Sequence, residues 1–323
     1  MATITRYVDP AATGTGDGTS WVNAYTTFAA WQTAEATNLV SDGDSHVVNI
    51  RGAHGASGVD IGSGFTTGAS NTLSIIGDYS GGAYDTNEAR FVKTTDWAWT
   101  NISVSNTIIE NVQFLNSASD NRPTLRITGA IDNSTFINVL VAGGPGVNCD
   151  IQNDGTSYWI NCQSHNSSGA GFEVPETGTG TTAYLYNCAA LNNGTYGFAV
   201  YAWRSMIVKN CYAGANTTAD FYAATNSTFT DTTCASSDGS ESTATVACAT
   251  GSGAYFTNVT AGSEDVTIGS SSALSDAGTD LSSDGTFSFD YDWEGDTRSD
   301  WSIGPDELSG GAPATVYPEW VFA

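Results

Sequence analysis

Two acidic side chains near the middle of the chain have the spacing that glycoside chemistry requires. Asp150 and Glu173 occupy the same position in successive short segments of alternating apolar residues, and Arg126 has that position one segment earlier. If these segments stack as neighbouring strands, equivalent side chains face solvent roughly 5 Å apart. That is the separation of the two carboxyl groups in a retaining glycosidase. Asp150 and Glu173 are therefore the candidate catalytic pair.

The same row also suits glycan binding without cleavage. Aromatic rings stack on sugar faces, and the aromatic residues that continue the row or lie close to it are Tyr201, Trp203 and Tyr222. Together with Arg126 they are the candidate glycan-binding residues. A third interpretation is a plain solvated surface, because exposed carboxylates are the default in so acidic a chain. The sequence leaves catalysis, binding and plain surface open.

A second acidic group imitates a calcium-binding loop. It consists of Asp290, Asp292, Glu294 and Asp296, with Gly295 among them. Calcium prefers carboxylate oxygens. The distal glutamate of an EF-hand loop is missing, however, because Trp301 stands at that position. The alternative account is that Arg298 pairs with a nearby carboxylate. The sequence therefore predicts no cofactor, with Ca²⁺ as the one candidate exception.

Other catalytic and metal chemistries find little support. The histidines are scattered and show no triad order, and no Cys-x-x-Cys or Cys/His cluster suggests zinc. A polysaccharide lyase needs a Lys or Arg base beside a calcium-binding carboxylate cluster. Arg126 is the one basic residue on the row, and lysine occurs only as Lys93 and Lys209. A lyase is therefore poorly supported.

The charge of the chain excludes further classes of partner. Its 34 acidic residues against nine basic ones give a formal net charge of −25. Nucleic-acid binding needs Lys and Arg to displace counterions, so it is improbable here. The electrostatic field of so many negative charges also repels polyanionic substrates. No stretch approaches the roughly 18 apolar residues of a membrane span. No signal peptide is visible, so we expect synthesis in a cytoplasm unless a leader was removed.

The scaffold for these side chains is a repeat of 23 to 27 residues. Segments of the form apolar–x–Asn–(Val or Cys) recur with their asparagines at Asn111, Asn138, Asn161, Asn187, Asn210 and Asn258. The following residues are Val112, Val139, Cys162, Cys188, Cys211 and Val259, and Thr233–Cys234 fills the gap before the last. Asn tolerates a left-handed φ, and its amide can bond to that of the next coil. The repeat predicts stacked coils with Asn at one bend.

A second apolar series precedes the first at a nearly constant distance. Its members are Leu125, Cys149, Phe172, Phe198, Phe221 and Val246. Period-two alternation points these side chains inward. The two series predict an all-β, single-stranded parallel β-helix over residues 46–261, with a Greek-key sandwich as the alternative. The cysteines are then expected to be reduced core thiols.

Both open ends of such a solenoid need covers. Residues 1–45 are predicted to form an N-terminal segment with a capping helix, because Trp21, Tyr25 and Phe28 follow a Thr/Ser cap signal at helical spacing. Residues 262–323 lose the repeat. They are predicted to form an irregular, loop-rich C-terminal cap that wraps back over the last coil.

Two segments carry a family resemblance. The opening resembles that of many right-handed parallel β-helix proteins of the pectate-lyase-like superfamily and reads RYVDPAATGTGDGTSWVNAYTTF. The end is similar to their closing motif, with SALSDAGTDL followed by DYDWEGDTRSDWSIGPDE. The resemblance implies a right-handed solenoid over nearly the whole chain. It is weak for function, because such proteins include lyases, hydrolases, adhesins and phage proteins.

Leaderless forms of this kind look like phage virion proteins. The resemblance therefore implies a non-enzymatic structural component of a bacteriophage virion, either a capsid decoration or fibre protein or a tail spike. It would be made in the host cytoplasm, displayed on the virion surface, and partnered by other capsid or tail proteins. The alternatives are a tail-spike-like protein that binds or cleaves a host surface glycan, with a homotrimer as one assembly, and an extracellular bacterial adhesin.

Overall fold

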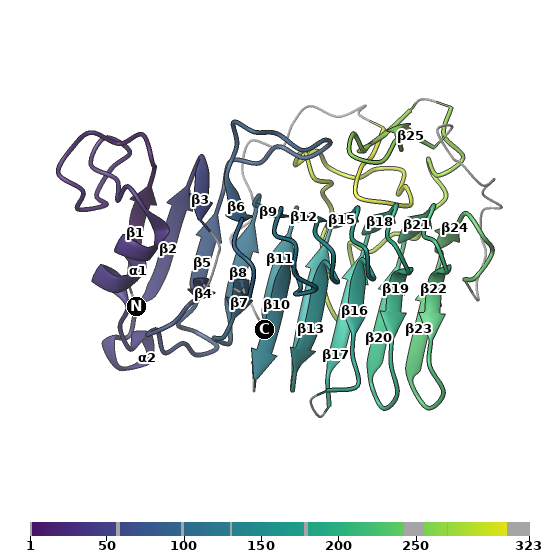
Figure 1. Cartoon of the computed structure of the whole chain (residues 1–323), viewed down its shortest axis with the longest axis horizontal. Helices are drawn as coiled ribbons and strands as arrows, with labels where there is room; N and C mark the ends of the chain where they lie inside the picture. The colour runs from purple at the N-terminus through teal and green to yellow at the C-terminus, as the bar shows by residue number, and fades with distance from the viewer. Residues whose placement is uncertain are drawn as a thin grey trace.

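Short strands stack on one another in three parallel sheets, which form the sides of an elongated coil (Figure 1). The computed structural model describes residues 2–55, 59–97, 100–129, 131–177, 180–241, 255–269 and 271–308. From β2 onwards the strand numbers advance by three within each sheet, so every turn of the chain adds one strand to each sheet. This arrangement is the predicted right-handed parallel β-helix.

The sheets differ in the number of strands that they contain. The nine-stranded sheet is built from β1 (Thr3–Val8), β2 (Ser45–Ile50), β5 (Leu73–Ile76), β8 (Thr107–Glu110), β11 (Ser134–Ile137), β14 (Thr156–Ile160), β17 (Thr182–Tyr186), β20 (Ser205–Lys209) and β23 (Thr228–Thr232). The eight-stranded sheet is built from β3 (Ala53–Gly55), β6 (Arg90–Lys93), β9 (Gln113–Asn116), β12 (Leu140–Gly143), β15 (Gln163–His165), β18 (Ala189–Leu191), β21 (Tyr212–Gly214) and β24 (Ala235–Ser236). The seven-stranded sheet is built from β4 (Val59–Ile61), β7 (Thr100–Ile102), β10 (Leu125–Gly129), β13 (Cys149–Asn153), β16 (Phe172–Val174), β19 (Tyr196–Val200) and β22 (Ala219–Ala223).

Asparagines form the bend between the nine-stranded and the eight-stranded sheet, as the sequence predicts. The backbone there is left-handed, with φ between 52° and 57° at Asn111, Asn138, Asn161, Asn187 and Asn210, which we call the asparagine ladder. Amides also bond between coils, since Asn138 Nδ2 donates to Asn111 Oδ1 at 2.9 Å. Asn is well suited to this bend because its short polar side chain tolerates a left-handed φ.

The interior is filled by the two predicted apolar series. Fully buried members of the first are Val112, Val139, Cys162, Cys188, Cys211 and Cys234. Rings of the second stack along the axis, with centroids 5.3 Å apart for Phe172 and Phe198 and 5.2 Å apart for Phe198 and Phe221. Cys149 is also buried, and the five described cysteines are free thiols. Cys248 and Val246 lie outside the described residues.

The N-terminal end is closed by two short helices, α1 (Phe28–Glu35) and α2 (Leu39–Asp42). Thr27 caps α1. The buried residues of α1, Phe28 and Trp31, join the core of the coil. The predicted helix was too long, because Trp21 and Tyr25 precede α1. Trp21 lies in a bend, and Tyr25 forms a parallel bridge with Val8 of β1. Strand β1, which the sequence pattern did not indicate, pairs with β2 in parallel register. No helix in the described ranges is long and apolar enough to cross a membrane.

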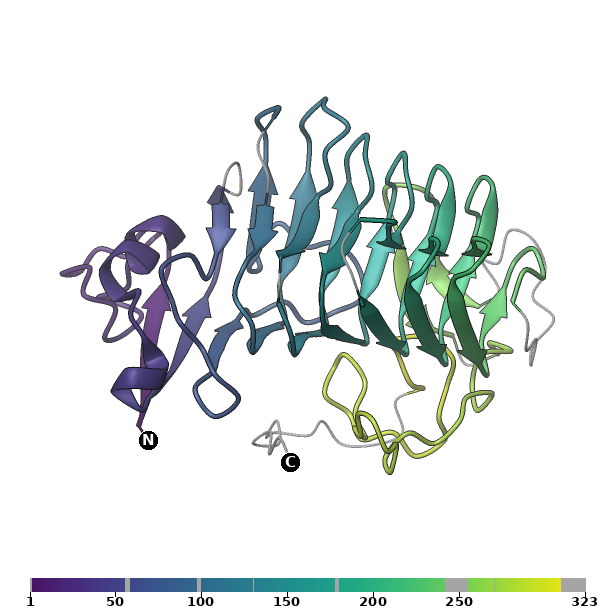
Figure 2. The ribbon, with the colours of Figure 1, turned by 90° about the horizontal axis from the view of Figure 1, so that it is seen from below.

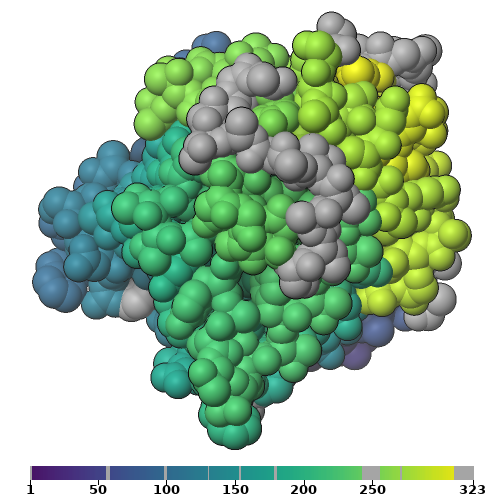
Figure 3. Space-filling view, turned by 90° about the vertical axis from the view of Figure 1, so that its right-hand side faces the viewer, coloured from purple at the N-terminus to yellow at the C-terminus, as the bar shows by residue number. Residues whose placement is uncertain are grey.

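Residues 271–308, which we call the closing segment, run back along the side of the coils (Figure 2) and lie beside the coils when the molecule is viewed from its end (Figure 3). Its apolar residues cover the outer faces of two sheets. Leu274, Trp293 and Ile303 pack on the eight-stranded sheet, and the cluster on the nine-stranded sheet contains Leu281, Phe289, Tyr291 and Trp301. The predicted wrap is therefore present, but it covers the length of several coils and not the last coil alone.

The asparagine ladder holds this segment in place. The side-chain amides donate to its carbonyl groups in the pairs Asn138–Trp293 (3.1 Å), Asn161–Tyr291 (3.1 Å), Asn187–Ser302 (3.0 Å), Asn187–Gly304 (2.9 Å) and Asn210–Thr279 (2.8 Å). The expected bonds between amides of neighbouring coils join Asn138 to Asn111 and Asn210 to Asn187, and the same amides also donate to the closing segment. Most of the donors face outward to a segment that contains no repeat.

The repeat does not continue to Asn258 and Val259. Strand β25 (Phe256–Asn258) pairs antiparallel with β26 (Asp265–Ile268), and Val259 packs in the cluster outside the eight-stranded sheet. Among the described residues, the last parallel strand is β24. The motif YFTNVTA therefore resembles the coils in sequence while forming part of the covering layer.

Aspartate substitutions in the core and in a turn should have opposite effects on folding: the first should disrupt it and the second should be tolerated. Cys188 is fully buried, so Cys188→Asp places a carboxylate without a partner in the stack, which costs several kcal/mol. Ser168 is exposed in a turn, and Ser168→Asp should fold as the wild type does. Circular dichroism and thermal unfolding of the two purified variants measure the difference. Equal tolerance would show that the inward register is wrong.

Thr233 occupies the ladder position with a β-branched side chain at φ 53°. Such a residue is strained in this conformation, so Thr233→Asn should raise the free energy of unfolding by about 1 kcal/mol. The lost contact between the hydroxyls of Thr233 and Thr279 works against this gain. Urea unfolding provides the measurement, with Thr232→Asn in the neighbouring exposed strand position as the control. A less stable Thr233→Asn variant would contradict the strain argument.

Candidate functional site

The predicted row of side chains exists on the outer face of the seven-stranded sheet. Strand pairing places Arg126 beside Asp150, Asp150 beside Glu173, and Glu173 beside Ala199. Tyr222 follows Ala199 on the next coil. Parallel strands lie about 4.8 Å apart, so each coil presents one of these side chains at a regular interval. Their functional role stays a prediction.

The row is longer than the sequence indicated. Asn101 pairs with Arg126 from the preceding coil, and Asp60 pairs with Asn101 one coil earlier. These coils precede the clear repeat, and no spacing signal in the sequence aligned them with the row. Gln152 was also missed, although period-two alternation places it on the same face as Asp150.

Asp150 is not the exposed residue that the sequence analysis expected, because only 6% of its surface is accessible. Arg126 Nε lies 3.8 Å from Asp150 Oδ2, and Gln152 Nε2 donates to the same oxygen at 2.7 Å. The Gln152 carbonyl in turn accepts from Arg126 Nε at 3.1 Å. Asp150 therefore lies beneath the longer side chains of Arg126 and Gln152, which are held by its charge.

Several acceptor atoms along the row can still accept a hydrogen bond. Within the described ranges, Asp60 Oδ1, Asn101 Oδ1 and Asp150 Oδ1 are buried and have no hydrogen-bond donor. A buried acceptor without a donor is destabilising, typically by about 1–3 kcal/mol. Such atoms favour a ligand that carries many hydroxyl groups, provided that the covering side chains move.

Burial shifts the acid–base behaviour of the pair. Desolvation raises the pKa of Asp150 to about 6, although Arg126 and the Gln152 amide oppose the change. Desolvation and the neighbouring Asp150 raise the pKa of Glu173 to about 7. Near neutral pH the pair therefore contains one carboxylate and one group that readily holds a proton, which is the division of roles that general acid–base chemistry uses.

Aromatic side chains surround the Glu173 end of the row. Tyr222 stacks on Tyr196 with ring centroids 4.3 Å apart, and Tyr201 lies 5.6 Å from Tyr222. The Tyr201 amide donates to the Val174 carbonyl at 2.9 Å, which fixes the chain beside β16. Burial, with the negative charge of Glu173, raises the pKa of Tyr201 to about 12, so its hydroxyl stays protonated as a donor.

Trp203 stands apart from these half-buried tyrosines. It is 73% exposed at a left-handed φ of 67°, in the turn between β19 and β20. Its amide donates to the Asn226 carbonyl at 3.0 Å and so links neighbouring turns. Trp203 therefore lies at the edge of the seven-stranded sheet with an accessible ring, and its role in glycan binding stays a prediction.

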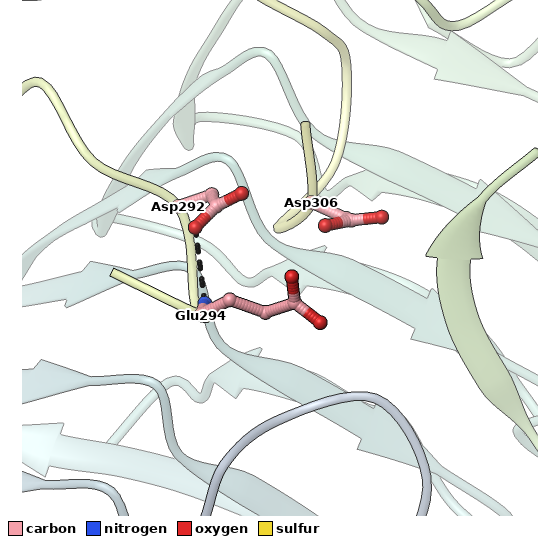
Figure 4. Close-up of side chains that lie close together, drawn as sticks. All are labelled: Asp292, Glu294 and Asp306. Carbon is pink, nitrogen blue, oxygen red and sulfur yellow. Dashed lines mark hydrogen bonds between the residues drawn. The ribbon is translucent and has the colours of Figure 1, made fainter. Parts of the chain in front are cut away.

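The acidic group near the C-terminus is arranged differently from the predicted loop. Asp292 and Glu294 converge with Asp306, and one oxygen from each lies within 4.8 Å of the others (Figure 4). Asp290 is exposed and Asp296 is buried outside this group. Asp306 comes from the far end of the closing segment, so local spacing gave no signal for it. Arg298 pairs with Glu307 at 3.0 Å, as the alternative account proposed for a nearby carboxylate.

Comparisons with known proteins concern the fold. No protein-family model matches the chain, and no curated protein sequence is significantly similar to it. Among solved structures it is similar to "Crystal structure of pectate lyase Pel9A", with a TM-score of 0.47 and 14% identity over 67% of this chain and 55% of that one. It is also similar to "Rhamnogalacturonan lyase", with a TM-score of 0.49 and 16% identity over 68% of this chain and 62% of that one. The matched region thus spans less than two thirds of each of those chains.

The raised pKa values of the pair predict a pH-dependent stability. Between about pH 4 and about pH 7 the folded protein holds protons that the unfolded chain has released, so the contribution of the pair to the free energy of unfolding falls as pH rises. We expect an Asp150→Asn/Glu173→Gln variant to lose less stability between about pH 5 and about pH 8, by on the order of 2 kcal/mol. Urea unfolding at the two pH values measures it. Asp290→Asn, at an exposed carboxylate, is the control, and equal slopes for all three proteins would contradict the assignment.

Proposed function

We propose that this protein is a glycan-binding β-helix that recognises a neutral or weakly charged polysaccharide along the outer face of the seven-stranded sheet. The observation that carries the proposal is the combination, on one row, of half-buried polar groups and stacked tyrosines. Arg126 and Glu173 offer a donor and an acceptor, and Tyr201 and Tyr222 offer ring surface beside them. Hydroxyl groups and apolar sugar faces match these two kinds of group.

The position of the row supports binding. The closing segment packs its apolar residues on the other two sheets, so its described clusters leave the seven-stranded sheet free. A regular interval of about 4.8 Å between coils is close to the length of one sugar ring, so consecutive coils can contact consecutive residues of an extended chain. The formal charge of −25 disfavours polyanions such as pectate.

Burial of Asp150 favours binding over cleavage. A catalytic carboxylate must reach the reacting atoms, whereas Asp150 lies under Arg126 and Gln152 and is bonded to them. Its contribution is to position Arg126. Glu173 remains half-buried and accessible as an acceptor. Glycan cleavage by the pair is the second candidate function, and the division of their pKa values is the observation that favours it.

We also propose that the protein is located on the surface of a bacteriophage particle, beside capsid or tail proteins. The support is the resemblance of the opening and closing segments to those of right-handed β-helix proteins of the pectate-lyase-like superfamily, which include phage proteins. The ligand would then be a glycan of the host surface, and a homotrimer is one assembly that would display several copies of the row. Mass spectrometry of purified virions from infected cells tests this placement separately from glycan binding.

Binding and cleavage are separated by a screen of neutral host-envelope and capsular polysaccharides. We expect binding without release of reducing ends. Tyr201→Ala should weaken binding about tenfold or more, because truncation of a central aromatic contact commonly costs over 1 kcal/mol. Tyr84→Ala is the matched control, since Tyr84 is exposed away from the row. Isothermal titration measures the affinity, and a reducing-end assay measures cleavage.

The two outcomes that would contradict the proposal differ. Absence of binding to any neutral glycan, with binding to anionic ones, would refute the substrate class. Reproducible release of reducing ends that Glu173→Gln abolishes would replace binding by glycosidase activity.

A further inference from the structure

The carboxyl groups of Asp292, Glu294 and Asp306 meet where two parts of the closing segment cross. Asp292 and Glu294 lie in one turn, and Asp306 comes from the irregular stretch that follows Arg298 (Figure 4). The turn itself is well defined, because Asp292 Oδ1 accepts from the amides of Glu294 (3.0 Å) and Asp296 (2.9 Å). The Asp292 carboxyl group is therefore fixed by the backbone of its own turn.

Two oxygens in this group are buried and have no donor. Asp292 is fully buried, and its Oδ2 has no hydrogen-bond partner in the described structure. Asp306 is 2% exposed. Its Oδ2 accepts from the Ile268 amide at 2.5 Å, whereas its Oδ1 has no partner among the described residues. Buried anionic oxygens without compensation are strongly destabilising, so these atoms point to a missing positive group.

Arg298 does not supply that group through hydrogen bonds. Its Nη1 donates to Glu307 Oε2 at 3.0 Å. Its Nη2 donates to Asn161 Oδ1 at 3.1 Å and to the Pro305 carbonyl at 2.7 Å, and its Nε donates to the Tyr291 carbonyl at 3.2 Å. The fully buried guanidinium thus directs its donors to Glu307, the ladder and carbonyl groups.

The donor atoms suit a hard divalent cation. Calcium binds carboxylate oxygens at roughly 2.4 Å, so oxygens on opposite sides of the ion can lie roughly 4.8 Å apart. One oxygen from each of the three carboxyl groups lies within 4.8 Å of the others. Magnesium requires about 2.1 Å and a closer set. Glu294 is exposed, and a pocket of about 640 Å³ lined in part by Glu294, Asp265 and Trp293 gives access for water ligands.

We propose that Asp292, Glu294 and Asp306 bind one calcium-sized divalent cation, which fastens the closing segment to the coils. The residues on either side of Asp292 are those whose carbonyls accept from the asparagine ladder, Tyr291 from Asn161 and Trp293 from Asn138. Through the Ile268 amide, Asp306 connects the same point to β26. The cation joins three stretches of the covering layer at one place.

Terbium luminescence tests the proposal directly on the full chain, with Tb³⁺ as the probe. Trp293 lies between two of the ligands in sequence and is buried beside them, so its excitation should sensitise bound terbium. We expect sensitised emission that calcium displaces. We also expect calcium to raise the thermal midpoint and EDTA to lower it, because a ligand that binds the folded state stabilises it.

Matched variants separate the site from general acidity. Asp306→Asn keeps an oxygen for the Ile268 amide but removes a charged ligand, and Glu294→Gln changes an exposed residue whose loss should not affect folding. Each should weaken terbium binding at least roughly tenfold, because even the loss of a group that only orients a ligand typically costs roughly 10–100-fold in metal affinity. Asp290→Asn, an exposed carboxylate in the same acidic run, should behave as the wild type.

Two results would overturn the proposal. One is wild-type emission no greater than that of both ligand variants, which would leave a shared proton as the group that neutralises the buried oxygens. The other is an equal loss of binding in Asp290→Asn, which would show that terbium responds only to the acidity of the surface. Neither result depends on whether the seven-stranded sheet binds a glycan.

Discussion

Register between neighbouring coils is the constraint on which the whole molecule depends. Parallel strand pairing fixes each coil against the previous one, and the asparagine ladder fixes where the chain bends, with φ near 52° on coil after coil. A slip of one residue would turn every inward side chain outward. The stacked Phe172, Phe198 and Phe221 rings fit in this register alone. Interior packing and surface pattern are therefore set together.

The same register creates rows on the outside, and the three sides use them differently. Two sides present apolar rows that the closing segment covers, with Ile137 and Ile160 on one and Leu191 and Tyr212 on the other. The third presents Arg126, Asp150 and Glu173, whose charges are brought together because each coil adds one member. Desolvation of neighbouring carboxylates then raises their pKa values. The raised pKa values are thus a consequence of the regular scaffold.

Periodic positions could be predicted from the sequence, whereas contacts between non-repeating segments could not. The ladder from Asn111 to Asn210 and the buried cysteines follow from spacing alone. Trp21 and Tyr25 have helical spacing without lying in a helix, because their neighbours are fixed by turns against β1. Asn258 repeats the motif in an antiparallel hairpin. Asp60, Asn101 and Asp306 join their groups through tertiary packing, which leaves no regular interval in the sequence to detect.

Because the closing segment bonds to the asparagine ladder, it can attach only if the coils that precede it in the chain have folded correctly. The carbonyls of Trp293 and Tyr291 accept from asparagines 155 and 130 residues earlier, and those of Ser302 and Thr279 from asparagines 115 and 69 residues earlier. All four bonds can form together only after the intervening coils have stacked at the correct height. Contacts so distant in sequence form late. A chain that lacks a coil, or in which one coil has not stacked, cannot form all four bonds. The apolar rows outside its sheets then stay accessible to chaperones and proteases.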